Sequence, residues 1–395
     1  MEENSKNNEP LNKDFKVPKL RFPEFKDEWK NGHFDNLFSF LSTNSLSWDD
    51  LSDNKEGIKN VHYGIIHASE ENIISSVSLP TIKKDFIPKK LNYFKDGDIF
   101  LADTSEDRKD CGKPLEIDNE NNFKIVGGLH TIHVTDKSNL CIPHFKAYSL
   151  QTPRYHKFTY CFAEGIKVFS LKPSLFKYFT FYYPQSKIEQ SKIVKLIDNL
   201  DHKIEILMMK LDTLKKYKEG LVDKLLISKG NDYIFLKDLI KIMPKGNLGA
   251  KMGIINGSYP FYLSGDNTSR LNSFMINGTY IIANDGGEAG FRLTKGKFSY
   301  SDHCICFKGD NDIVTVNLFN YLNSIKRQIT YKGFTGSGLK NIDRQYFFKL
   351  KIPQKIRDVQ LAKVFQLVQT YIDNLEQEVK LAHLLKTNIL NNMFI

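Results

Sequence analysis

The chain has few of the features that mark secreted, membrane-bound or disulfide-stabilised proteins. Its five cysteines are scattered and odd in number, which indicates reduced thiols in a cytoplasmic protein. No run approaches the ~18 consecutive apolar residues of a membrane span. The start, MEENSKNNEPLNKDFK, is polar and acidic, unlike a signal peptide. These absences predict a cytoplasmic protein with no membrane partner.

Sequence motifs of catalysis are also missing. There is no GxxxxGK[ST] phosphate loop and no [DNS]PP[YF] tetrapeptide of the kind that holds a flipped adenine. FTGSG (334–338) imitates a methyltransferase cofactor loop, but without its partner motif it is interpreted as a turn. His303–Cys306 alternates like a strand and lacks a second ligand pair at zinc-finger spacing. We interpret four acidic residues as solvated surface rather than a metal site: Asp98, Asp103, Asp107 and Asp110. The chain is therefore expected to hold no cofactor and no metal, and not to be an enzyme.

Charge points to a class of partner. The 395 residues suffice for two or three domains, and a hydrophobic content of 41% is ordinary for a globular protein. The formal net charge of +10 favours a polyanionic partner such as nucleic acid. A lysine-rich proteome from an AT-rich genome would give the same excess, so charge alone leaves both explanations open.

Two stretches carry the same heptad pattern 168 residues apart (365 − 197 = 168). The predicted seam residues of the first are Ile197, Leu200, Ile204, Leu207, Leu211 and Leu214, and those of the second are Phe365, Val368, Ile372, Leu375 and Val379. Each stretch predicts a long helix that must bury its stripe against another helix. Each also has one lysine in the seam, Lys218 and Lys386, which either fixes the register or extends to water near a frayed end.

The segments before the two helices are β-rich and similar to each other. GDIFLAD (97–103) matches GTYIIAN (278–284) at an offset of 181, and FDNLFSF (34–40) matches LKDLIKI (236–242) at 202. The predicted order is an N-terminal arm (1–30), a first module (31–183), a helix opened by Pro184 (184–229), a second module (230–352) and a helix opened by Pro353 (353–395). We predict an α+β fold with a pseudo-twofold duplication, in which two β-rich modules are separated by two long antiparallel coiled-coil helices.

Several of these segments resemble a known family. The matching pieces are the arm PKLRFPEFKDEW, the pair GDIFLAD and GTYIIANDGGEAG, the module ends EGIKVFSLKPSLFKYFTFYYPQ and GSGLKNIDRQYFFKLKIPQ, and the helix openings SKIEQSKIVKLIDNLDHKI and IRDVQLAKVFQLVQTYIDNL. In this order they resemble the specificity subunits of type I restriction-modification systems. The second helix opening departs from the pattern, because Val359-Gln360 stands where the first has Glu189-Gln190.

The resemblance implies a non-catalytic subunit that binds double-stranded DNA. Its two β-rich modules would be target-recognition domains that read the halves of a bipartite site, with the helices as a ruler between them. It also implies two methyltransferase (modification) subunits docked on the helices, joined by restriction (translocase) subunits. Adenine methylation and cleavage would then be carried out by these partners.

Candidate DNA contacts lie in the loops between predicted strands, because Arg, Lys, Asn and Gln read base edges and bind phosphates. In the first module they are Arg108, Lys109, Arg154, Tyr155 and His156; in the second they are Lys245, Asn247, Lys251, Arg270, Arg292 and Lys332. Two alternatives remain: a standalone two-module DNA-binding regulator, and a coiled-coil scaffold whose modules bind proteins.

Overall fold

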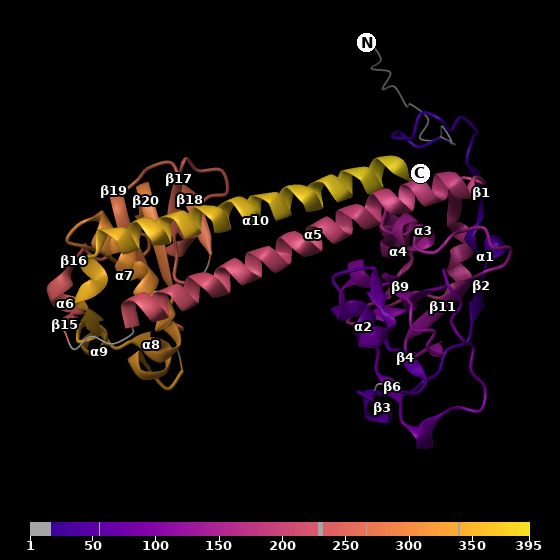
Figure 1. Ribbon diagram of the computed structural model, residues 1–395, viewed down its shortest axis with the longest axis horizontal. Helices are drawn as coiled ribbons and strands as arrows, with labels where there is room; N and C mark the ends of the chain where they lie inside the picture. The colour runs from indigo at the N-terminus through magenta and orange to yellow at the C-terminus, as the bar shows by residue number, and fades with distance from the viewer. Residues whose placement is uncertain (1–16, 55, 228–231, 266, 339) are drawn as a thin grey trace, which may run out of the picture. The chain divides into compact units, whose positions relative to one another are not determined.

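The computed structural model describes residues 17–54, 56–227, 232–265, 267–338 and 340–395. It forms two compact units (Figure 1). Unit 1 runs to Ile204 and also includes Leu381–Ile395, and unit 2 is Glu205–Lys380. Residues 1–16 of the predicted arm, and the predicted boundary at 229–230, lie outside the described residues. Within the described ranges, no helix is both long and apolar enough to cross a membrane.

Unit 1 contains two main sheets. The five-stranded sheet has the order β2 (Phe38–Leu41), β11 (Thr131–Asp136), β7 (Ile99–Ala102), β9 (Pro114–Asp118), β5 (Ile73–Ser75). The four-stranded sheet has the order β10 (Ile125–Gly127), β4 (Lys59–Val61), β6 (Thr81–Ile82), β3 (Leu51–Ser52). Smaller sheets join β12 (Glu164–Gly165), β13 (Phe169–Ser170) and β8 (Thr104–Ser105), and β1 (Lys30–His33) with β14 (Thr180–Tyr183). The short helices are α1 (Phe34–Leu37), α2 (Tyr63–Ala68), α3 (Phe145–Ser149) and α4 (Pro153–Phe162).

Unit 2 is built on one larger sheet. Its order is β16 (Ile240–Ile242), β21 (Cys304–Gly309), β19 (Ile276–Asn284), β20 (Phe291–Tyr300), β17 (Tyr259–Tyr262), β18 (Thr268–Leu271). Two-stranded sheets pair β15 (Tyr233–Phe235) with β24 (Lys351–Pro353), and β22 (Phe334–Thr335) with β23 (Asn341–Ile342). The short helices are α6 (Leu236–Leu239), α7 (Asp312–Ser324), α8 (Lys326–Gly333) and α9 (Arg344–Phe348). His303–Cys306 leads into β21, as the strand interpretation predicts.

The internal repeat is visible in the strand order of the two units. The antiparallel series β2-β11-β7 of unit 1 recurs as β16-β21-β19 in unit 2. In unit 1 Val134 pairs with Ile99, and both side chains belong to the core cluster that also contains Ile193 and Ile197. In unit 2 Phe307 pairs with Ile281 in the corresponding cluster. Ile99 is therefore equivalent to Ile281, an offset of 182 (281 − 99 = 182). The sequence match at 181 was one residue out, and such a slip assigns every side chain to the opposite face.

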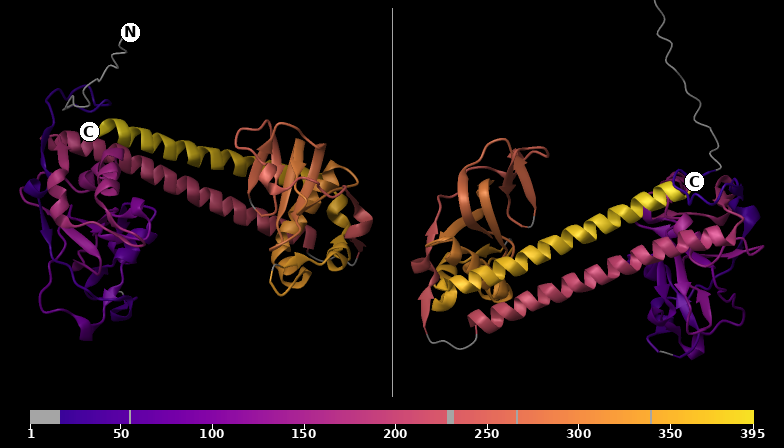
Figure 2. Two further views of the ribbon diagram at one scale, coloured as in Figure 1. Left: turned by 180° about the vertical axis from the view of Figure 1, so that it is seen from behind. Right: turned by 45° about the horizontal axis from the view of Figure 1, so that its top comes forward.

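Two long helices complete the architecture. α5 is Lys187–Val222, followed by a π-helical turn at Asp223–Ile227, and α10 is Val359–Met393. In unit 1 the first turns of α5 lie beside the last turns of α10, and Ile193 and Ile197 share a core with Leu390 and Met393 (Figure 2). In unit 2 the end of α5 meets the start of α10, where Val222 packs in one cluster with Phe365. The helices are therefore antiparallel within each unit. All eleven predicted seam residues are buried or half-buried.

The helices begin later than their opening prolines suggest. α5 starts three residues after Pro184, where the Ser186 hydroxyl accepts a hydrogen bond from the Glu189 backbone N–H (3.2 Å). Pro353 is the last residue of β24, and a 3-10 turn at Gln354–Arg357 precedes α10. The Asp358 carboxylate then accepts from the Gln360 N–H (2.8 Å). In both cases a side-chain acceptor, rather than the proline, marks the first turn of the helix.

The arm is fixed to α5 by Glu189, where the opening of α10 has Val359. Arg21 donates two hydrogen bonds to the Glu189 carboxylate (2.7 and 2.9 Å), and the Trp29 indole N–H donates a third (3.0 Å). Gln190 donates to the backbone carbonyls of Leu140 and Pro184, both at 2.9 Å. Glu189 and Gln190 are 2% and 0% exposed. Glu189 and Gln190 therefore organise unit 1 internally.

Candidate nucleic-acid interface

The four candidate arginines all bind backbone carbonyls of their own unit. In unit 2, Arg270 donates to the carbonyls of Gly257 and Ser258 (2.9 Å to the latter). Arg292 donates to those of Leu263 and Asn267 (3.2 Å to the latter), and its guanidinium lies 5.2 Å from the centre of the Tyr262 ring. A planar guanidinium with several N–H groups suits such bridging. Arg270 and Arg292 hold loops in place in this way, and we call these two side chains the arginine clamps.

The two arginines of unit 1 are held in the same way. Arg108 donates to the Ala163 carbonyl (3.0 Å) and lies 4.8 Å from the centre of the Tyr160 ring. Arg154 donates to the Ile395 carbonyl (3.3 Å) and lies 4.6 Å from the centre of the Tyr182 ring. Their positive charge still contributes to the local field, but their donors are partly committed to the protein. The four arginines therefore have positioning roles that the sequence reasoning did not foresee.

The loop after β16 is anchored by its backbone and exposes two of the candidate side chains. Its inner positions are anchored: the Tyr300 hydroxyl donates to the Pro244 carbonyl (2.6 Å), and the Asp302 N–H donates to that of Leu248 (3.2 Å). A Cβ on Gly246 would lie 2.6 Å from the Ser301 carbonyl oxygen, so only glycine fits there. The candidate side chains on either side of Gly246 are exposed. They are Lys245 and Asn247, and the exposed Lys251 follows in a 3-10 turn.

The remaining candidates divide by exposure. Lys109, His156 and Lys332 are exposed, and the first two line a cavity of about 300 Å³ in unit 1 together with Lys386. Tyr155, however, is 1% exposed, and its hydroxyl donates to the Gly112 carbonyl (2.7 Å). The helix α4 points this ring into the core while its neighbour His156 faces out. Tyr155 is therefore removed from the candidate interface.

A second exposed group in unit 1 escaped the sequence reasoning. Trp48 is 52% exposed, and its ring lies 4.4 Å from the His62 ring. His62 in turn contacts Tyr63 (4.6 Å between ring centres), and Tyr63 meets His130 edge-on (5.4 Å). Lys83 donates to the carbonyl beside Trp48, that of Asp49. We define the Trp48 patch as Trp48, Tyr63, Lys83 and His130.

The segment that begins at Lys83 extends this patch. In KKDFIPKK (83–90) the four lysines are exposed, and Phe86 and Ile87 between them are 47% and 43% exposed. Interleaved cations and apolar side chains suit a partner with phosphates and flat bases. Four lysines in eight residues were the available signal in the sequence. Beneath the patch, burial lowers the pKa of His62, which is neutral near pH 7 and accepts a hydrogen bond from the Gly64 N–H (3.1 Å).

Unit 1 also contains buried ionisable residues that contact one another. Asp98 is 2% exposed and contacts the His133 ring nitrogen at 2.8 Å, which corrects its assignment to solvated surface. Glu116 is 1% exposed; its Oε1 accepts from the His144 N–H (2.8 Å), and its Oε2 is buried without a partner. Burial raises the pKa of Glu116 to about 7. The network joins the module to α5, because His144 contacts Asp198 at 3.1 Å.

Each unit thus combines the same series of three antiparallel strands with antiparallel ends of α5 and α10. Each also presents exposed lysines in anchored loops. These features define the class of protein. Comparisons agree with this class. Residues 229–381 match the family described as Type I restriction modification DNA specificity domain. A crystal structure of a type I restriction-modification system S subunit from M. genitalium has a TM-score of 0.60 and 16% identity, covering 96% of this chain and 99% of that one.

A second structure gives the same result. It comes from work on the structural basis of complex assembly and conformational transition of the type I restriction-modification system. Its TM-score is 0.56 and its identity 12%, and the match covers 92% of this chain and 96% of that one. No curated protein matches the chain in sequence. The family match covers residues 229–381, and the two solved structures share the fold of the chain as a whole.

Proposed function

We propose that each module reads one half of a split DNA site, and that the chain directs adenine methylation there, or cleavage when the site is unmodified. The observation that carries this proposal is a repeated frame with unrepeated loops. The series β2-β11-β7 and β16-β21-β19 match, whereas the Trp48 patch of unit 1 and the Lys245 loop of unit 2 have different residues. Two copies of one frame with different surfaces suit two different half-sites.

Partner subunits would dock on the helices. Exposed apolar side chains support this step, because exposed apolar surface of this kind marks protein interfaces. In unit 2, Ile206, Met209 and Tyr217 line a groove of about 600 Å³ with Leu214 of α5 and Leu375 of α10. We propose two modification subunits per chain, joined by restriction subunits, in the cytoplasm. The expectation of two rests on the repeat and on the family resemblance.

The decisive experiment is a map of N6-methyladenine in a host that carries this chain and its modification subunit, compared with a deletion of this chain alone. Loss of one split motif, two short sequences around a fixed gap, is the expected result. An unchanged map would overturn the proposal.

A loop-level test uses a matched pair of lysines. Lys245→Gln removes an exposed cation from the anchored loop, and Lys349→Gln removes one from an exposed position after α9. The first should weaken DNA binding and lower the slope of log affinity against log salt by about 1. The second should change neither. Equal effects of the two variants would show that the Lys245 loop is not a DNA contact.

The same assay separates the alternatives. A protein scaffold would show little salt dependence, because it releases no counterions from DNA. A standalone regulator would bind DNA with a steep salt slope but would leave the methylation map unchanged. Only a specificity subunit gives both a steep slope and a motif that disappears on deletion.

A further inference from the structure

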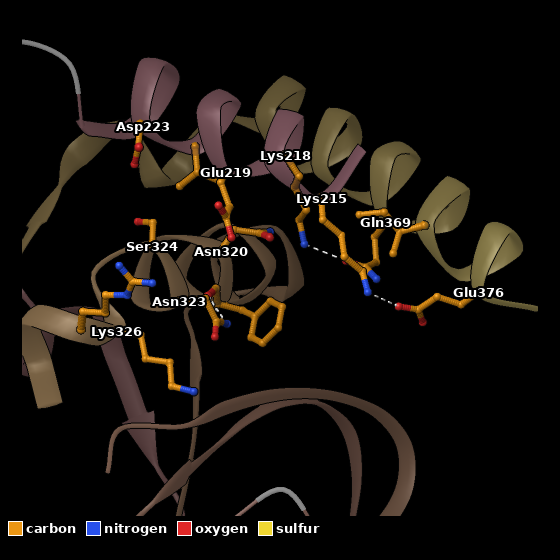
Figure 3. Close-up of a pocket in the computed structure, with 14 residues that line it drawn as sticks. Lys215, Lys218, Glu219, Asp223, Asn320, Asn323, Ser324, Lys326, Gln369 and Glu376 are labelled. Atoms are coloured by element: carbon orange, nitrogen blue, oxygen red, sulfur yellow. Dashed lines mark hydrogen bonds and ion pairs between the residues drawn. The ribbon is translucent and has the colours of Figure 1, made fainter. Parts of the chain in front are cut away.

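The two seam lysines make the same cross-helix contact in their respective units. In unit 2 the Lys218 Nζ donates to the Gln369 side-chain oxygen at 2.7 Å (Figure 3). In unit 1 the Lys386 Nζ contacts the Asp201 carboxylate at 2.5 Å. The donors are 168 residues apart (386 − 218 = 168), and so are the acceptors (369 − 201 = 168). The contact is therefore a repeated feature of the chain.

Each lysine also lies against a ring of the adjacent module. Lys218 is 5.8 Å from the centre of the Phe319 ring of α7, and Lys386 is 5.7 Å from that of Tyr148 of α3. In unit 1 the Tyr148 hydroxyl donates to Asp198 (2.6 Å) and to Asp201 (3.0 Å). Each ammonium group thus joins three elements: its own helix, the opposite helix and a module helix.

These lysines do not extend to water at frayed ends. α5 continues past Lys218 to Val222, and α10 continues past Lys386 to Met393. The Lys386 side chain is 19% exposed and that of Asp201 is 31% exposed. Lys218 lies in a cavity of about 590 Å³ lined also by Phe319 and Gln369 (Figure 3), and burial lowers its pKa. Each ammonium group therefore needs its acceptor on the opposite helix.

Only one helix register provides both acceptors. The other seam residues are apolar, so within the seam itself a slip of one heptad still sets apolar side chains opposite one another. A slip that brings Lys218 opposite Glu376 (376 − 369 = 7) brings Lys386 opposite Met208 (208 − 201 = 7). The opposite slip brings Lys218 opposite Ala362 and Lys386 opposite Val194. Each slip leaves at least one ammonium group facing an apolar side chain.

We propose that Lys218 and Lys386 are positioning residues that select one register of α5 against α10 and thereby set the gap between the two half-sites. This inference rests on the proposed function. A slip of one heptad moves antiparallel helices by roughly 10 Å, which is about three base pairs of DNA. The lysines thus determine the length of the gap between the half-sites, which no contact with a base determines.

The test compares two substitutions of Asp201 that remove the same charge. Asp201→Gln keeps an acceptor, and Gln is the natural residue at the equivalent position 369. Asp201→Leu removes the acceptor. Methylation by the complex is measured on duplexes whose gap runs from three base pairs shorter to three longer than the native one. Asp201→Leu should raise the ratio of off-gap to native-gap methylation by about tenfold, the factor for one lost charge-assisted hydrogen bond. Asp201→Gln should leave the ratio within about twofold, because it keeps the acceptor.

Controls separate the register proposal from the proposed function on which it rests. Lys216→Met changes a solvent-facing lysine of α5, 73% exposed, and should not alter the gap ratio. A double-mutant cycle of Lys386→Met and Asp201→Leu, read as thermal stability without DNA, should show coupling. Coupling in a chain whose wild type methylates no split site would contradict the proposed function alone. A wild type that methylates its split site, with no coupling and equal gap ratios for both Asp201 variants, would overturn the register proposal.

Discussion

Replacing Glu116 by Gln should stabilise unit 1 above neutral pH. Gln keeps an oxygen that accepts from the His144 N–H and replaces the buried, unpartnered oxygen of the carboxylate with a neutral group. Burial raises the pKa of Glu116 from its ordinary value of 4.5 to about 7. The folded state therefore holds this proton more tightly than the unfolded chain. The stability that the proton provides is fully present below pH 4.5 and is lost as the pH rises through about 7.

The size of the effect follows from the shift. About 2.5 pKa units at roughly 1.4 kcal/mol each give about 3 kcal/mol lost between pH 4.5 and pH 8. The Gln variant should avoid this loss, so its advantage over the wild type should grow from near zero at pH 4.5 to about 3 kcal/mol at pH 8. Urea unfolding of the full chain at pH 4.5, 6.5 and 8 measures it. The stability that protonated His144 contributes is also lost as the pH rises, because the pKa of His144 is raised in the folded state. Burial alone would lower that pKa, but the hydrogen bond to Asp198 and the charge of Glu116 outweigh burial.

The comparison of variants isolates Glu116 from the other titrating groups. Glu120→Gln, at an exposed position two residues beyond the same strand, should give no pH-dependent difference from the wild type. A Glu116→Gln variant whose stability differs from the wild type by the same amount at all three pH values would refute the reasoning. It would mean that the carboxylate is solvated or paired in solution.

Three further substitutions test the frame. Leu207→Pro, at a buried position inside α5, should cost about 3 kcal/mol and abolish recognition of both half-sites; an unaltered methylation map would contradict the ruler role. Tyr155→Phe should lose about 1 kcal/mol through its bond to the Gly112 carbonyl, measured by thermal unfolding, but leave the methylated motif unchanged. Glu189→Ala should cost about 3 kcal/mol because it leaves Arg21 unpaired beside the arm, and limited proteolysis should then cut the arm faster than in the wild type.

Periodic features of the fold could be predicted from the sequence. A heptad seam depends only on residues a few positions apart, and every predicted seam residue is at least half-buried. The segment GDIFLAD was likewise predicted to be β-rich, and β7 occupies Ile99–Ala102. Its alternate residues enter two core clusters, with Ile99 in one and Phe100 in the other. The repeat was recognisable too. Its alignment was one residue out, because it superimposed Gly97 on Gly278, whereas the strand pairings make Ile99 equivalent to Ile281.

Contacts between distant segments could not be predicted. Asp98 reads as surface because it is a carboxylate that follows the polar segment Lys95–Gly97, yet His133, 35 residues later, lies beside it in the core. Arg270 and Arg292 read as DNA contacts because Arg in a Gly- and Asn-rich loop suits that role, but the loops bend so that their own carbonyls reach the guanidinium groups first. Periodicity carries no information about such partners, because they depend on how far a loop bends back.

The arginine clamps have a consequence for how this protein can change its target over generations. Every residue in a loop has a backbone carbonyl, whatever its side chain. A guanidinium group that binds the carbonyls of Gly257 and Ser258, or of Leu263 and Asn267, therefore keeps its partners when the neighbouring loop residues are replaced. Exposed positions of these same loops, such as Asn256 and Asn267, can then be replaced while each loop keeps its path. Under the proposed function, new DNA preferences can therefore arise from single substitutions in these loops, without a loss of folding stability that would first have to be repaired.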